Sequence, residues 1–147
     1  MRLRFEVGGE EFSLAGRASS ELKRALGRLG VAPEHVRRAA VAMYEAEINM
    51  VIHAGGGVAE AEIEADRVSM TLTDTGPGIP DLGLAMTEGW STAPERFREL
   101  GFGAGMGLPN IKRNVDELSV ETAPGKGTRV EMVVRFEGAA RPEGGGS

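Results

Sequence analysis

Three polar side chains recur at a spacing of four residues in one long run of the sequence. Glu45, Asn49 and His53 stand at i, i+4 and i+8 of PEHVRRAAVAMYEAEINMVIHA, so they share one face if this run is a helix. An Asn amide oxygen is a hard ligand that suits Mg²⁺, which keeps waters and takes phosphate oxygens. A Glu one turn earlier could accept a proton from a hydroxyl or water that approaches a phosphate. Taken alone, such a stripe is more often a solvated helix face.

Other polar residues near this stripe are expected to have ordinary roles. Glu47 lies about 160° round a regular helix from Glu45, so we expect it at the surface. His53 is expected to be structural or to line the edge of a pocket, because no second set of metal ligands accompanies it. Lys112 and Arg113 fit a solvated face.

Three glycine-rich segments could bring backbone close to a ligand. DTGPGI (74–79) follows a strand-like run, GFGAGMGLPNIKR (101–113) alternates glycines before a helical run, and PGKGT (124–128) joins two strand-like runs. Free backbone N–H groups followed by a helix N-terminus favour anions, phosphates above all. Taken alone, each segment is more simply explained by a turn or loop, and neither a P-loop nor a dinucleotide fingerprint is present.

Two helices are expected before the first of these glycine segments. Ser19 and Ser20 are candidate caps of a helix that stops at Gly30. Pro33 opens the long helix, and the glycines at 55–57 end it. The apolar positions of the long helix that can pack on a sheet are Val36, Ala40, Met43, Ala46, Met50 and Val51.

The strand-like runs are joined mostly by short turns, which favours antiparallel pairing. RLRFEV and EEFSL flank Gly8 and Gly9 as a predicted hairpin. We therefore predict an α+β fold, a two-layer sandwich with helices on one face of a mixed, mainly antiparallel sheet. The other predicted elements are strands over 58–65 and 67–74, helices over 81–89 and 108–118, and a hairpin over 118–123 and 128–136.

The composition is that of a globular chain. Of 147 residues, 41% are hydrophobic and 27% are charged, and the net charge of −5 argues against a nucleic-acid surface. The absence of cysteine excludes disulfides, thiol nucleophiles and cysteine-ligated metals. No apolar run approaches the ~20 residues of a membrane span. We expect a cytoplasmic protein with no membrane contact, one domain over residues 1–138 and a disordered tail over 139–147.

Taken in order, the motifs resemble those of the GHKL ATPases, the group of gyrase, the Hsp90 chaperone, histidine kinases and MutL. The matching segments are EAEIN (45–49), DTGPGI (74–79), GAGMGL (103–108) and GKGT (125–128). Together they span most of the chain. The resemblance implies the two-layer fold of that group and a site for ATP and Mg²⁺.

The same segments resemble, within that group, the small bacterial serine kinases of the anti-sigma and stress-switch type. That subgroup implies phosphorylation of a serine on a STAS-domain antagonist and binding of a sigma factor or a phosphatase, and it allows a homodimer. Ile52 stands where histidine kinases usually carry a basic residue. His35 and His53 are the two histidines, so a helical hairpin with a phosphoacceptor histidine is not expected.

The resemblance also implies roles for individual residues. Asn49 would hold Mg²⁺, Glu45 would be the catalytic base for an incoming serine hydroxyl, and Asp74 would accept a hydrogen bond from the adenine amine. Thr128 would reach the adenine site, and residues 87–102 would form a lid. The implied nucleotide-binding residues are Asn49, Asp74, Gly76, Gly78, Ile79, Gly103, Ala104, Gly105, Met106, Gly107, Leu108 and Thr128.

Two functions remain open on the sequence alone. The first is a serine protein kinase that also sequesters a partner, and the second is a nucleotide-gated binding switch or ATPase with little kinase activity. Glu45 favours the kinase, because a pure switch needs no base, although related ATPases use the same Glu for hydrolysis. The catalytic fragment of a split histidine kinase ranks third.

Overall fold

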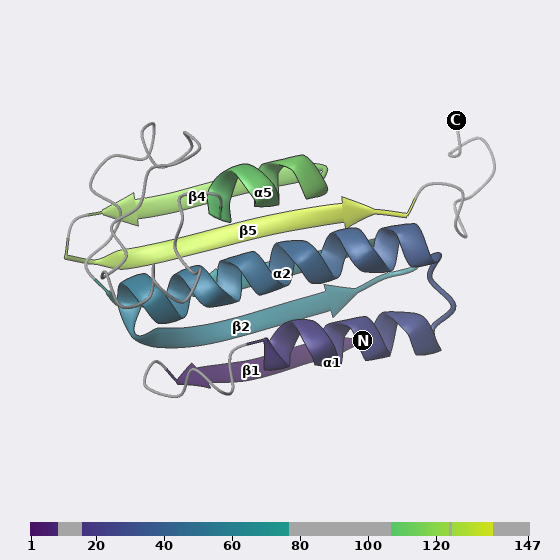
Figure 1. Ribbon diagram of the computed structural model, residues 1–147, viewed down its shortest axis with the longest axis horizontal. Coiled ribbons are helices and arrows are strands. Elements are labelled where there is room, and N and C mark those ends of the chain that lie inside the picture. The colour runs from purple at the N-terminus through teal and green to yellow at the C-terminus, as the bar shows by residue number, and fades with distance from the viewer. Residues whose placement is uncertain (9–15, 77–106, 124, 137–147) are drawn as a thin grey trace, which may run out of the picture.

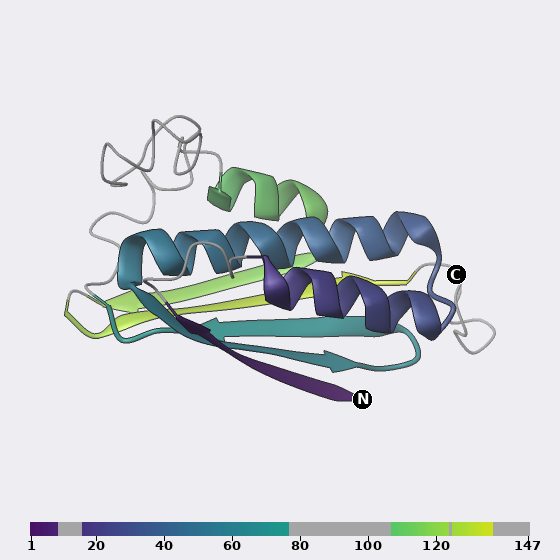
Figure 2. The same ribbon diagram turned by 60° about the horizontal axis from the view of Figure 1, so that its bottom comes forward.

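The computed structural model describes residues 1–8, 16–76, 107–123 and 125–136. These residues form two layers, a five-stranded sheet and helices that cover one of its faces (Figures 1 and 2). The predicted α+β sandwich is confirmed. The strands are β1 (Arg2–Gly8), β2 (Gly56–Ile63), β3 (Arg67–Thr73), β4 (Glu117–Ala123) and β5 (Gly127–Arg135), and the helices are α1 (Arg17–Arg28), α2 (Pro33–Ala54) and α5 (Gly107–Asn114).

The strands are ordered β1-β2-β3-β5-β4, and each neighbouring pair is antiparallel. β5 returns between β3 and β4, so the start of β5 lies beside the end of β3, with Thr73 opposite Arg129. β1 pairs along its whole length with β2. The predicted partner of β1 at residues 10–14 and the predicted helix at 81–89 lie outside the described residues.

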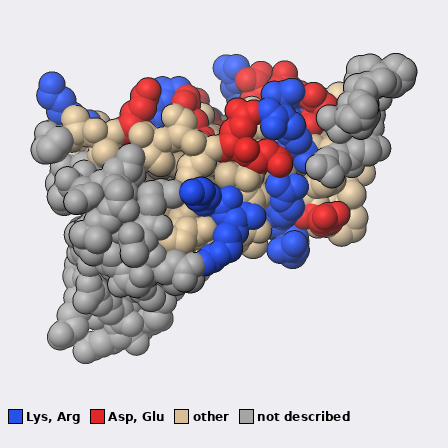
Figure 3. Space-filling model, turned by 90° about the horizontal axis from the view of Figure 1, so that it is seen from above, with Lys and Arg blue, Asp and Glu red and all other residues tan. Residues whose placement is uncertain are grey.

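Apolar and charged side chains alternate along the strands, so the sheet has an apolar inner face and a charged outer face. The outer face carries cross-strand ion pairs such as Arg2–Glu62 and Arg4–Glu60, which are exposed. Basic and acidic side chains are also interspersed on the face seen in Figure 3. The inner face buries Ala59, Ala61, Ile63, Val68, Met70, Leu72, Met132 and Val134 under the helices.

α2 is the middle helix, with α1 on one flank and α5 on the other (Figures 1 and 2). It begins with Pro33 in its first turn and ends at Gly55, whose φ of 78° is the left-handed conformation that glycine tolerates. Both ends were predicted. Of its predicted sheet-facing residues, all are buried except Ala40, which is half-buried. No helix in the described part of the chain is long and apolar enough to cross a membrane.

The capping predicted for α1 is wrong. The helix begins at Arg17, its N-cap is Gly16, and no side chain of its own caps it. Ser19 instead lies inside the first turn, where its Oγ donates to the Gly16 carbonyl oxygen at 3.0 Å. Ser20 follows it and is exposed, so neither serine is the cap.

Glu47 of α2 supplies the missing cap, so its predicted surface position is also wrong. Its carboxylate accepts hydrogen bonds from the Ala18 N–H at 3.1 Å and the Ser19 N–H at 3.4 Å, and the residue is 1% exposed. The prediction failed because the side of α2 opposite Glu45 faces α1 and not solvent. Burial raises the pKa of Glu47, and the backbone N–H groups of α1 oppose that rise.

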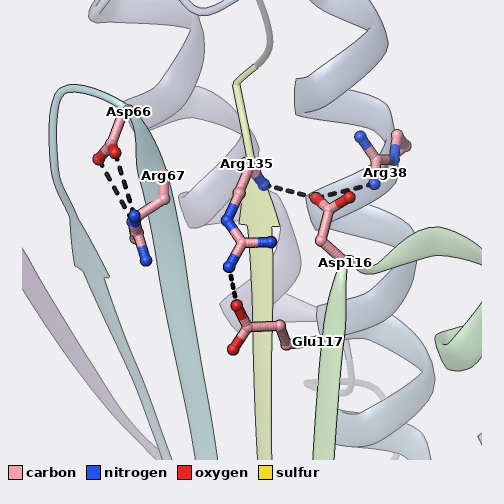
Figure 4. Close-up of polar contacts among 6 residues, drawn as sticks. All are labelled: Arg38, Asp66, Arg67, Asp116, Glu117 and Arg135. Carbon is pink, nitrogen blue, oxygen red and sulfur yellow. Dashed lines mark hydrogen bonds and ion pairs between the residues drawn. The ribbon is translucent and has the colours of Figure 1, made fainter. Parts of the chain in front are cut away.

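The helix predicted over 108–118 is shorter than expected, because it stops at Asn114 and β4 begins at Glu117. Arg38 of α2 holds this junction: its Nε donates to the Asn114 carbonyl oxygen at 3.1 Å, and its Nη2 donates to Asp116 Oδ2 at 3.1 Å (Figure 4). The same Asp116 oxygen accepts the Arg135 N–H at 2.6 Å. One carboxylate therefore ties α2 to the end of β5 at the point where α5 gives way to a strand.

Candidate functional site

Asp74 lies directly after β3, beside the start of β5. Its Oδ1 accepts hydrogen bonds from the Gly76 N–H at 2.9 Å and the Thr128 N–H at 3.2 Å, and its own N–H donates to the Thr128 carbonyl oxygen at 3.0 Å. Within the described ranges, no group donates to Oδ2. One carboxylate oxygen therefore fixes the turn, and the other keeps its capacity to accept a hydrogen bond.

Three glycines allow close packing around this aspartate. A Cβ on Gly76 would lie 2.6 Å from Ala54 Cβ, so the C-terminal end of α2 already requires glycine there. Gly127 has a φ of 91° and lies against the Asp74 carbonyl group. A Cβ on Gly57 would lie 2.7 Å from Met50 Sδ and 3.1 Å from Asp74 Cα. Gly57 was predicted only as part of a helix stop, and it also makes room for Asp74.

Thr128 lies next to Asp74, and a second threonine accompanies it. The Thr128 and Thr122 hydroxyl oxygens are 3.0 Å apart across the β4–β5 pair. Thr122 Oγ1 is also 3.3 Å from the Gly127 carbonyl oxygen, to which it can donate. Sequence reasoning missed Thr122, although its place opposite Thr128 follows from the hairpin register.

The stripe of Glu45, Asn49 and His53 lies half-buried on α2. Burial lowers the pKa of His53, and the nearby Asp74 carboxylate opposes that change, so the stripe reaches the Asp74 end of the sheet. The side chain of Asn49 makes no hydrogen bond within the described part of the chain.

Glu45 is the residue of the stripe that faces α5. Its Oε2 accepts a hydrogen bond from Asn110 Nδ2 at 3.2 Å. Burial raises the pKa of Glu45, and the Asn110 bond works against that rise. Sequence reasoning did not single out Asn110. The available signal was a second Asn in a helix, directly after the glycine segment.

α5 begins at Gly107, the last glycine of the segment 103–108. Leu108 and Ile111 are buried and hold the helix against α2. The first turn of α5 therefore lies on the Glu45 flank of α2. Of the predicted site residues, Gly78, Ile79, Gly103, Ala104, Gly105 and Met106, together with the lid at 87–102, lie outside the described residues.

The few oxygen ligands near the stripe suit a cation that takes most of its ligands from water and substrate. Among the described residues, no group of three or more His, Asp or Glu side chains could hold a metal ion. Asn49 offers one amide oxygen. Mg²⁺ fits such a sparse set, because it keeps waters and binds substrate phosphates together with one or two protein oxygens.

Comparison with known proteins identifies relatives of the chain. The sequence model of the family described as histidine kinase-, DNA gyrase B-, and HSP90-like ATPase matches residues 34–138. Serine/threonine-protein kinase RsbT of Bacillus subtilis is 34% identical over 119 residues, which is 75% of this chain and 84% of that protein. The anti-sigma F factor of Pasteuria penetrans is 36% identical over 100 residues, which is 63% of each chain.

Solved structures share the fold. The RsbU and RsbW domains of a Mycobacterium tuberculosis protein align with a TM-score of 0.62 at 17% identity, over 92% of this chain and 32% of that one. The mycobacterial sensor histidine kinase MprB aligns with a TM-score of 0.52 at 18% identity, over 92% of this chain and 97% of that one. The resemblance to anti-sigma and stress-switch kinases is thus confirmed, and the chain belongs to the histidine kinase-, DNA gyrase B- and HSP90-like family of ATP-binding domains, the GHKL ATPases.

Proposed function

We propose that this chain transfers the γ-phosphoryl group of ATP–Mg²⁺ to a serine of a STAS-domain antagonist protein. The observation that carries the proposal is Glu45, a half-buried carboxylate one helical turn before Asn49. A carboxylate there can take the hydroxyl proton of a serine as that serine approaches the phosphate. The names of the relatives, a serine/threonine-protein kinase and anti-sigma F factors, support this reaction.

The transfer needs a nucleotide held at both ends. Asp74 Oδ2 would accept a hydrogen bond from the adenine amine, with Thr128 beside it. Asn49 would hold Mg²⁺ through its amide oxygen, and the ion would neutralise charge on the phosphate oxygens. The remaining proposed nucleotide contacts come from Gly76, Gly78 and Ile79 and from the backbone of residues 103–108.

Glu45 then has one chemical task. The serine Oγ forms a bond to the γ-phosphorus while the bond from that phosphorus to the bridging oxygen breaks, and ADP leaves with the electron pair. The serine proton passes to the Glu45 carboxylate and afterwards to water. Because burial raises the pKa of Glu45, its carboxylate is a stronger base than an exposed one.

Phosphoryl transfer can be tested with γ-labelled ATP, Mg²⁺ and a candidate STAS-domain protein. Label is expected on a serine of that protein, and Glu45→Ala is expected to lose transfer by at least about 100-fold. Glu34→Ala is the matched control, since Glu34 is an exposed carboxylate on the same helix. Equal transfer by wild type and Glu45→Ala would show that Glu45 is not the catalytic base.

A second function is favoured by the similarity to proteins named anti-sigma F factor. In this function ATP selects the partner, either a sigma factor or a phosphatase, and little phosphate is transferred. ATP-dependent binding of the STAS-domain protein without label in it would support this switch over the kinase. We propose a second copy of the chain as a further partner, and residues 1–138 as the domain that binds each of them.

A further inference from the structure

The side-chain amide of Asn110 contacts Glu45 through its nitrogen and Arg113 through its oxygen. While its Nδ2 faces Glu45 Oε2 at 3.2 Å, its Oδ1 accepts a hydrogen bond from Arg113 Nη1 at 2.8 Å. A reversed amide would direct its oxygen at the carboxylate and its NH₂ group at the guanidinium, so both contacts would become repulsive. Arg113 therefore selects the orientation in which Asn110 donates to Glu45.

We infer that Asn110, oriented by Arg113, is a positioning residue for the Glu45 carboxylate. The inference deepens the proposed function and rests on it, because it takes Glu45 as the base. With Oε2 held by the amide, Oε1 is the oxygen left to receive the serine proton. A held carboxylate also loses less side-chain freedom when the substrate arrives.

The position of Asn110 links the base to the nucleotide. Asn110 and Gly107 share the first turn of α5, and Gly107 ends the glycine segment proposed to contact the phosphates. The buried Ile111 and the Arg38 bond to the Asn114 carbonyl oxygen hold the rest of α5 against α2. Any shift of that first turn would therefore move Gly107 and the partner of Glu45 together.

The plainer alternative is that Asn110 only ties α5 to α2. Under that alternative, removal of the amide would loosen the helix and weaken nucleotide binding, so KM for ATP would rise. A positioning role predicts a different pattern, in which kcat falls while KM for ATP stays unchanged. The two roles are thus separable by kinetics.

The hydrogen bonds themselves can be observed by NMR on ¹⁵N-labelled full-length protein. The side-chain amide signals of Asn110 are assigned by their loss in Asn110→Leu. They are expected to shift in Glu45→Gln and in Arg113→Ala, and to stay in place in Lys112→Ala. Lys112 is the matched control, because it is an exposed cation next to Arg113. Unmoved Asn110 signals in Glu45→Gln would overturn the inference.

Kinetics of transfer to the STAS-domain protein supply the second measurement. Asn110→Leu is expected to lower kcat about tenfold and to change KM for ATP less than about twofold. Asn110→Asp, which sets two carboxylates against each other, is expected to lose more. Asn114→Ala is the control, since the Asn114 side chain bonds only the Asn110 carbonyl oxygen of its own helix among the described residues.

Failure of this inference differs from failure of the proposed function. If wild type transfers phosphate and Asn110→Leu keeps the wild-type kcat, the positioning role is overturned and the kinase remains. If wild type transfers none, the kinase is overturned, and the NMR comparison still decides whether Arg113 and Asn110 hold Glu45.

Discussion

At the scale of single residues, Asp74 divides its two carboxylate oxygens between different tasks. Oδ1 is occupied by the backbone N–H groups of Gly76 and Thr128, and these bonds fix the side chain relative to β5. Oδ2 accepts no hydrogen bond from the described residues. A ligand that presents a hydrogen-bond donor, such as an adenine amine, completes this carboxylate.

The variant Asp74→Asn tests this division. Its amide oxygen must remain at the Oδ1 position to satisfy both N–H groups, so its NH₂ group would take the Oδ2 position. A donor would then face the donor of the adenine amine. We expect ATP affinity to fall by about 10- to 100-fold, the loss of one charge-assisted hydrogen bond, with the fold kept.

Calorimetric titration with ATP–Mg²⁺ measures this loss. Asp66→Asn is the control, because Asp66 lies at the other end of β3 and pairs with Arg67 (Figure 4). Both variants lose one negative charge, so a general effect of charge would weaken them equally. Wild-type affinity in Asp74→Asn would refute the assignment of adenine to this residue.

At the scale of elements, α2 lies between two helices, so polar side chains on its two opposite faces each contact a neighbouring helix. Glu45 faces Asn110 of α5, and Glu47 faces the N-terminus of α1. Glu47 takes the place of an N-cap side chain for α1. Its bonds satisfy backbone N–H groups that would otherwise be buried without a partner.

Replacement of Glu47 is expected to be costly to stability. Glu47→Ala removes the acceptor of the Ala18 and Ser19 N–H groups and leaves a cavity, so we expect a loss of about 2–4 kcal/mol in the free energy of unfolding. Glu47→Gln keeps one amide oxygen as an acceptor and should lose less than half of that. Urea denaturation measures both values. Equal losses would show that the amide oxygen of Gln cannot replace the carboxylate, and no loss in either variant would show that Glu47 does not cap α1.

Asp116 makes stability depend on acid pH at the α5–β4 junction. Partial burial works to raise the pKa of Asp116, but the Arg135 N–H and the Arg38 and Arg135 guanidinium groups outweigh it and hold the pKa below its ordinary value. Because the pKa of Asp116 is lower in the folded state than in the unfolded state, its carboxylate stabilises the fold at any pH above the unfolded-state pKa. This stabilisation is lost as pH falls through the folded-state pKa. Asp116→Asn should therefore show a shallower loss of unfolding free energy below about pH 4.

Urea denaturation between pH 7 and pH 3 tests this slope. Glu21→Gln is the control, since Glu21 belongs to an exposed i, i+3 pair with Arg24. Curves for wild type and Asp116→Asn that stay parallel down to pH 3 would show that Arg38 and Asp116 do not couple folding to protonation.

The same elements show which parts of the structure could be predicted from the sequence. Both ends of α2 were predictable because Pro33 and Gly55 act locally, and the strands were predictable from their alternation. The roles of Glu47 and Asn110 depend on which helices flank α2. Helical periodicity shows which residues share a face, but it does not reveal what lies opposite that face.

At the scale of the whole molecule, the candidate site gathers elements that are far apart in the sequence. The C-terminal half of α2, the end of β3 and the start of β5 meet at one end of the sheet, and the first turn of α5 lies beside them (Figure 1). Arg38 holds the opposite end of α5 through the Asn114 carbonyl oxygen. It also pairs with Asp116, just after that helix (Figure 4). A nucleotide bound across these elements would hold them together.

Ligand binding to such a site should raise the stability of the whole domain. ATP–Mg²⁺ at about 100 times its Kd is expected to add about 2.7 kcal/mol to the free energy of unfolding, because it binds the folded chain and not the unfolded one. Asn49→Ala should lose most of this increment by losing the proposed Mg²⁺ ligand, and removal of Mg²⁺ by EDTA should have the same effect on wild type. Asn114→Ala, the matched change on α5, should keep the full increment. Thermal denaturation with and without nucleotide measures each case, and an equal rise in Asn49→Ala and wild type would place the cation away from α2.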